Sequence, residues 1–88
     1  MAQPQPDSTS SHRDFYLAAA MLANGAHFLR VDRQGNVGFF VFAEKEKCER
    51  LVAAYFQGDL MVRAKDFTSA IRSLKDALFS VMPHDNRM

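Results

Sequence analysis

The sequence contains few of the residues that catalytic and metal-binding proteins use. Its single cysteine, Cys48, excludes an intramolecular disulfide. The three histidines, at positions 12, 27 and 84, lack the spacing to cysteines or carboxylates that builds a tetrahedral zinc site. The four glycines stand singly, so none forms a phosphate-binding loop. We therefore predict no enzyme activity, no cofactor and no metal.

Long apolar runs and an excess of charge are also missing. No apolar run approaches the roughly 20 residues needed to span a bilayer, and no hydrophobic N-terminal segment suggests a signal peptide. The formal net charge is +1 and the pI is near 7.9, which argues against a strongly basic nucleic-acid arm. We expect a cytoplasmic protein with no membrane segment.

Hydrophobic residues, in contrast, are plentiful. They make up 48% of the 88 residues and include eight phenylalanines, each worth about 1.5–3 kcal/mol when fully buried. A chain of this length forms one small domain. We predict a compact domain over residues 12–82, preceded by a disordered tail over 1–11 and followed by a frayed tail over 83–88.

The first helix is expected over residues 12–24. Ser11 and Asp14 have the spacing of a capping box, in which a hydroxyl and an acidic side chain satisfy free N–H groups at a helix start. Apolar residues then recur at helical spacing between Phe15 and Leu22. Asn24-Gly25 supplies a residue that tolerates the left-handed conformation at a helix end.

A β-hairpin follows, with strands over residues 27–33 and 37–42 joined by the turn residues Gln34-Gly35-Asn36. A two- or four-residue loop places Leu29 and Val31 on the same face as Phe40 and Phe42, which we predict to be the core face. The second face then carries Phe28, Arg30, Asp32, Val37, Phe39 and Val41. A three-residue loop with a bulge reverses this pairing.

The second half of the chain predicts two helices. One begins near residue 43 and ends at Gly58, with Cys48 on its apolar stripe as a small buried hydrophobe. The other is an amphipathic helix over 64–82 that ends before Pro83. Between them, residues 60–62 predict a short strand. The fold class is α+β, in the order helix, β-hairpin, helix, short strand, helix, with helices covering a small antiparallel or mixed sheet.

Two surfaces are candidates for function. The first is the second hairpin face, with Phe28, Arg30, Val37, Phe39 and Val41 as a candidate interaction face. We expect a protein partner or a second copy of the chain to cover it, because apolar sheet faces are usually buried. The alternative is a contact with single-stranded nucleic acid or DNA through Arg30, Arg33, Arg63, Lys65, Arg72 and Lys75.

The order of motifs resembles a small uncharacterised domain-of-unknown-function family found in bacteria, phages and mobile elements. The resemblance covers residues 13–79 and rests on Asp14 to Ala19 with Gly25, Val37 to Phe42, the run Leu51, Tyr55, Gly58, Leu60, Val62, and finally Phe67, Ala70 and Leu74-Lys75. It implies an accessory protein that works by contact. It also suggests a further alternative, a phage-type inhibitor of a host or defence protein. No functional residue follows from it.

Overall fold

A computed structural model describes residues 8–82 of the chain. In chain order its elements are β1 (Thr9–His12), α1 (Phe15–Ala23), β2 (Phe28–Gln34), β3 (Val37–Ala43), α2 (Lys45–Gln57) and α3 (Ala64–Val81). The α+β class is confirmed. The tails predicted over 1–7 and 83–88 lie outside the described residues.

β3 is the central strand of a sheet whose order is β1-β3-β2, and both neighbours run antiparallel to it. This position follows from composition, because Val37 to Ala43 is the most apolar segment and only a central strand is shielded at both edges. β1 is a correction to the predicted tail over 1–11. Thr9 to Ser11 pair with β3, and this polar segment is held by backbone hydrogen bonds that side-chain patterns do not reveal.

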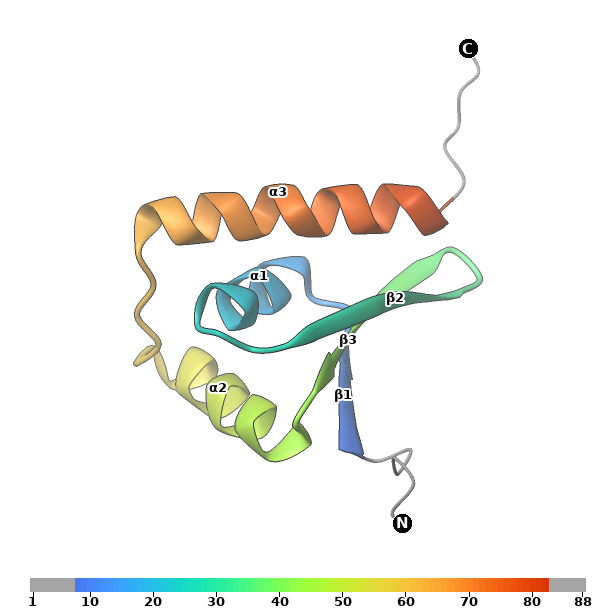
Figure 1. Ribbon diagram of the computed structural model, residues 1–88. Coiled ribbons are helices and arrows are strands. Elements are labelled where there is room, and N and C mark those ends of the chain that lie inside the picture. Colours follow the sequence, from blue (N-terminus) through green and yellow to red (C-terminus); the bar gives the residue numbers. More distant parts are fainter. Residues whose placement is uncertain (1–7, 83–88) are drawn as a thin grey trace.

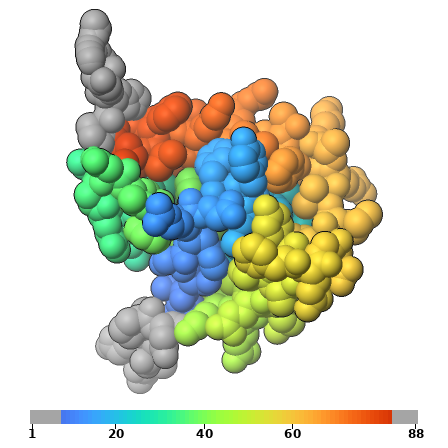
Figure 2. All heavy atoms as spheres, turned by 180° about the vertical axis from the view of Figure 1, so that it is seen from behind, coloured from blue at the N-terminus to red at the C-terminus, as the bar shows by residue number. Residues whose placement is uncertain are grey.

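All three described helices lie on one face of the sheet. α1 lies between α3 and α2, and α3 also runs alongside β2 (Figure 1). From behind, α1 (light blue) occupies the centre, between α3 (orange) and α2 (yellow-green) (Figure 2). The buried side chains of the core cluster are Leu17, Ala18, Ala19, Met21, Ala26, Val31, Phe40, Phe42, Cys48, Ala70 and Leu74. The core therefore forms a single layer between the sheet and the helices.

α1 begins later than predicted because its cap is Asp14. The Leu17 N–H donates to Asp14 Oδ1 at 3.1 Å, which satisfies one of the free N–H groups at the helix start. Ser11 belongs to β1 and does not cap the helix, so the predicted capping box is wrong. The helix starts at Phe15 because the chain must first leave the sheet.

The β2–β3 hairpin has a two-residue turn, with Gln34 opposite Val37. Gly35 has φ +62°, a left-handed conformation that glycine adopts without a steric penalty. From Arg30 onward the predicted facing is confirmed, since Val31 lies opposite Phe40 and Arg30 lies opposite Val41.

A β-bulge between Phe28 and Arg30 reverses the facing at the start of β2. Leu29 is the extra residue and is 41% exposed, although the sequence predicted it in the core. Phe28 instead lies opposite Phe42, with ring centroids 5.5 Å apart. The prediction failed because a bulge shifts side-chain alternation by one residue. The only bulge considered from the sequence was one in the hairpin turn, and this one lies at the start of β2.

The segment from α2 to α3 was predicted partly correctly. α2 ends at Gln57, where Gly58 with φ +81° forms the C-cap, as expected. Residues 60–62 are not a strand; this short segment connects α2 to α3 and does not pair with either edge of the sheet. α3 over Ala64–Val81 is confirmed, and its C-cap Met82 is extended, as favoured before Pro83.

Gly38 allows α3 to approach β3 closely. An added Cβ at this position would lie 2.5 Å from Leu78 Cδ1 and 3.2 Å from Val31 Cγ1, both too short for unstrained contacts. The glycine therefore makes room for the Leu78 side chain on the core face of the sheet.

Candidate functional site on the outer face of the sheet

The side of the sheet opposite the helices carries a compact group of residues from β2 and β3, which we call the outer face: Arg30, Asp32, Val37, Phe39 and Val41. Alternation along β3 directs Phe40 and Phe42 into the core, so Val37, Phe39 and Val41 point the other way. None of these three belongs to the core cluster or to the side chains packed against it. No described helix therefore covers the outer face.

Val41 lies at the centre of the outer face and is 1% exposed. Its register neighbours are Ser11 on β1 and Arg30 on β2. At the bulge, Leu29 and Arg30 together oppose this one residue. The apolar surface that a partner can touch is therefore formed mainly by Phe39 and Val37, which are half-buried, with Leu29 at the margin.

Arg30 and Asp32 form the polar edge of the outer face. Arg30 Nε donates to Asp32 Oδ1 at 2.8 Å, and Arg30 Nη2 donates to Asp32 Oδ2 at 3.3 Å. This is the only ion pair within residues 8–82, and both side chains are about half exposed. Because alternate residues of a strand share a face, the pairing leaves the outer face with an apolar centre and a neutralised charged rim.

Four of the five residues predicted for the interaction face lie together: Arg30, Val37, Phe39 and Val41. Phe28 does not, and this is a correction. Its ring lies 5.5 Å from that of Phe42 and 6.4 Å from that of Phe40, so it belongs to the core. Asp32 was not predicted as a site residue. Its position two residues after Arg30 on a predicted strand was a signal for it, because alternate residues of a strand share a face.

The six basic residues predicted to contact nucleic acid are divided between two surfaces. Arg30 is paired with Asp32, and Arg33 Nε donates to the Gly35 carbonyl at 2.8 Å. The other four are exposed on α3 or at its N-cap, and none takes part in an ion pair within the described part of the chain: Arg63, Lys65, Arg72 and Lys75. Arg30, on the outer face, is thus separate from the α3 cations, whereas Arg33 lies opposite Gly38 on the helix side of the sheet.

His12 and Cys48 lie on the core side, at the junction of β1 and α2. Ser10 Oγ shares a hydrogen bond with His12 Nε2, and the His12 ring lies 6.4 Å from that of Phe42. Burial lowers the pKa of His12 below 6.5, partly offset by the Asp14 carboxylate. Burial, followed by the charge of Glu44, raises the pKa of the Cys48 thiol. Both groups are therefore neutral at pH 7.

Stability is expected to fall as the pH drops below 6.5. Above that value His12 is neutral in both the folded and the unfolded chain, so its protonation does not change the free energy of unfolding. Below it the unfolded chain binds a proton that the folded chain resists, and stability is lost until the pH passes the lowered pKa of His12. Urea unfolding at a series of pH values measures this loss.

The control for this effect is the His12→Gln variant, whose pH dependence between 7.5 and 5 should be weaker than that of the wild type. Equal pH dependence in the wild type and the His12→Gln variant would contradict the assignment.

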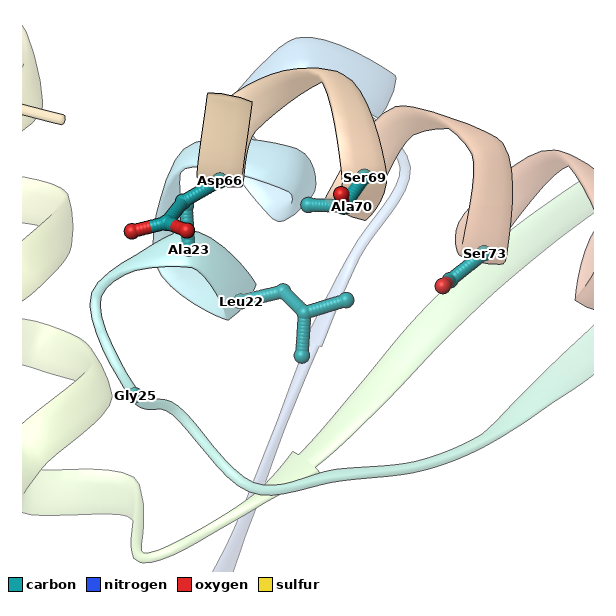
Figure 3. A pocket seen from close by; sticks show the side chains of 7 residues that line it. All are labelled: Leu22, Ala23, Gly25, Asp66, Ser69, Ala70 and Ser73. Carbon is teal, nitrogen blue, oxygen red and sulfur yellow. The ribbon is translucent and has the colours of Figure 1, made fainter. Parts of the chain in front are cut away.

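A shallow groove lies between the end of α1 and the first half of α3 (Figure 3). Its volume is about 390 Å³, and it is lined by Leu22, Ala23, Gly25, Asp66, Ser69, Ala70 and Ser73. The lining offers one carboxylate and two hydroxyls but contains no histidine, lysine or cysteine beside the serines. Apolar residues and Gly25 make up the rest of the lining, and no nucleophile paired with a histidine or lysine base is present in it.

A second hollow of about 680 Å³ lies at the start of α2, where Lys45, Lys47 and Arg50 are among its lining residues.

Within residues 8–82 no three histidine, cysteine or acidic side chains are grouped so that they could hold a metal ion. In the same part of the chain, every helix falls short of the length and apolar character required to cross a bilayer.

Comparison with known proteins gives one match. A family model described as Domain of unknown function (DUF5659) matches residues 9–80, which include β1 and extend beyond the 13–79 range of the resemblance. No curated protein matches the chain, and no solved structure matches it either. The predicted kinship with a family of unknown function is confirmed, and its description assigns no activity.

Proposed function

Because this chain belongs to the DUF5659 family, for which no activity is described, we propose its function from its own surface: a small non-enzymatic protein-interaction module that forms a homodimer through its sheet. The observation that carries the proposal is the apolar surface of the half-buried Val37 and Phe39, beside the buried Val41, on the face of the central strand that no described helix covers. Such a strip beside a polar rim is typical of an interaction surface.

The charges support a contact between proteins. Arg30 is paired with Asp32 by two hydrogen bonds, so the adjacent carboxylate offsets the positive charge that a phosphate would require. A neutral rim around aromatic and aliphatic residues suits a protein surface of the same kind. We include in the proposal a cytoplasmic location, which the single cysteine favours, and an accessory role in a bacterium or phage, which the resemblance implies.

Light scattering over a concentration series tests the homodimer. We expect the mass to rise from that of a monomer to that of a dimer between low and high micromolar concentrations. If the copies associate through the outer face, Phe39→Glu should weaken the association by about tenfold to a hundredfold, since a buried phenylalanine contributes about 1.5–3 kcal/mol.

The matched control is Phe56→Glu on α2. This phenylalanine is 70% exposed and lies on a helix, not on the outer face of the sheet. It should dimerise like the wild type. A wild type that remains monomeric at every concentration, or a Phe39→Glu variant that dimerises normally, would overturn the use of this face.

The second candidate function is nucleic-acid contact by α3. It is favoured by Arg63, Lys65, Arg72 and Lys75, which are exposed and form no ion pair within residues 8–82. Asp66 and Asp76 on the same stretch reduce its positive potential. Binding of a fluorescent oligonucleotide should then weaken steeply with added salt, and the absence of binding at low salt would remove this candidate.

A further inference from the structure

β2 is an edge strand with a backbone available for further pairing. The sheet order β1-β3-β2 leaves one side of β2 without a partner strand in the described part of the chain. β2 has seven residues, whereas β1 at the opposite edge has four. An unpaired edge of this length presents N–H and C=O groups that can pair with another strand.

We propose that β2 pairs antiparallel with β2 of a second copy, with each Val31 opposite the Val31 of its partner. This inference rests on the proposed homodimer and places its contact at the β2 edge of the sheet, as an alternative to association face to face. With Val31 on the two-fold axis, Arg30 of one copy lies opposite Asp32 of the other, and the symmetry repeats the pair. The contacts that now join Arg30 and Asp32 within one strand are exchanged for two contacts between strands.

The charge pattern selects this register over its neighbours. Shifting the axis to Asp32 places two carboxylates directly opposite each other, and shifting it to Arg30 places two guanidinium groups opposite each other. Like charges at directly opposed positions destabilise a strand pair, and opposite charges stabilise it. Of these three registers, only the one centred on Val31 places both Arg30 and Asp32 opposite a side chain of opposite charge.

The same pattern argues that these charges do not serve only to prevent the edge of β2 from pairing with other strands. Edge strands that avoid self-association carry charges of one sign, often lysine, because copies of such an edge repel each other. Arg30 and Asp32 have opposite signs on either side of Val31, so the edge is complementary to itself.

The pairing also unites the outer faces. A two-fold axis perpendicular to the sheet keeps the same face upward in both copies, so the apolar strips of the two β3 strands lie on one side of a six-stranded sheet. The bulge at Leu29 bends β2 just before the paired segment, so regular pairing begins at Arg30. A short paired segment predicts an association that depends strongly on concentration.

Charge exchange between copies provides the test. Arg30→Asp and Asp32→Arg are each introduced alone, and the two variants are then mixed in equal amounts. Each single variant places like charges opposite each other and should dimerise at least about tenfold more weakly than the wild type. The mixture restores every complementary pair and should form a heterodimer of nearly wild-type affinity, detected by native mass spectrometry. The doubly exchanged chain, R30D/D32R, should again form a homodimer.

The outcomes separate the register from the proposed function. Single variants that dimerise like the wild type, or a mixture that remains monomeric, would overturn the register. If those results accompany a dimer that Phe39→Glu disrupts, the copies associate face to face and the proposed homodimer stands. A monomeric wild type overturns both. Both substituted side chains are exposed, and circular dichroism of each variant verifies that it is folded.

Discussion

Replacing Phe40 with alanine is expected to destabilise the domain by about 3–5 kcal/mol, the cost of removing a large aromatic side chain from a core. Phe40 is among the largest fully buried side chains of the described residues. Its ring lies 5.8 Å from that of Phe15 and 6.4 Å from that of Phe28, so its removal leaves a cavity at the point where α1 meets the sheet.

This loss is large for so small a domain. A chain of this length has a free energy of unfolding of about 4–13 kcal/mol, so the Phe40→Ala variant retains little stability or unfolds. Urea unfolding followed by circular dichroism measures the difference from the wild type. Dilute protein is needed, so that self-association does not contribute to the stability.

Phe39→Ala is the matched control because it changes the same residue type on the same strand. Phe39 lies on the outer face and is only half-buried, so its truncation should cost the dilute monomer much less than that of Phe40. A larger loss for Phe39→Ala than for Phe40→Ala would mean that the facing of β3 is the reverse of the one described.

Replacing Gly38 with valine is expected to cost about 1–3 kcal/mol through overpacking. The first added carbon alone would lie 2.5 Å from Leu78 Cδ1, so either the Leu78 side chain or the whole of α3 must move. Valine is otherwise well suited to a strand, so a loss of stability isolates the steric effect. Thermal or urea unfolding provides the measurement.

A double-mutant cycle with Leu78→Ala tests this cause. Truncating Leu78 removes the atom that an added side chain would meet, so Gly38→Val should be less destabilising in the Leu78→Ala background than in the wild type. Strictly additive effects would show that Gly38 is needed for some reason other than room for Leu78.

The sequence by itself determined the elements whose signals are local. The apolar run from Val37 to Phe42 predicted the strand that supplies most of the aromatic core, and the periodicity from Phe67 to Leu78 predicted α3. Gly58 was identified as the end of α2 because a left-handed cap favours glycine. The turn residues Gly35-Asn36 located the hairpin. Each of these features depends on residues that are close together in the chain.

Tertiary structure decided the remaining features, which depend on distant partners. Thr9 to His12 form a strand only because the edge of β3 accepts their backbone hydrogen bonds, whereas residues 60–62 connect two helices and pair with no strand. The bulge at Leu29 exchanged the places of Phe28 and Leu29, since a side chain's facing depends on its register with the neighbouring strand. The pairing of Arg30 with Asp32 on an edge strand could likewise be recognised only after the strand order placed β2 at the edge.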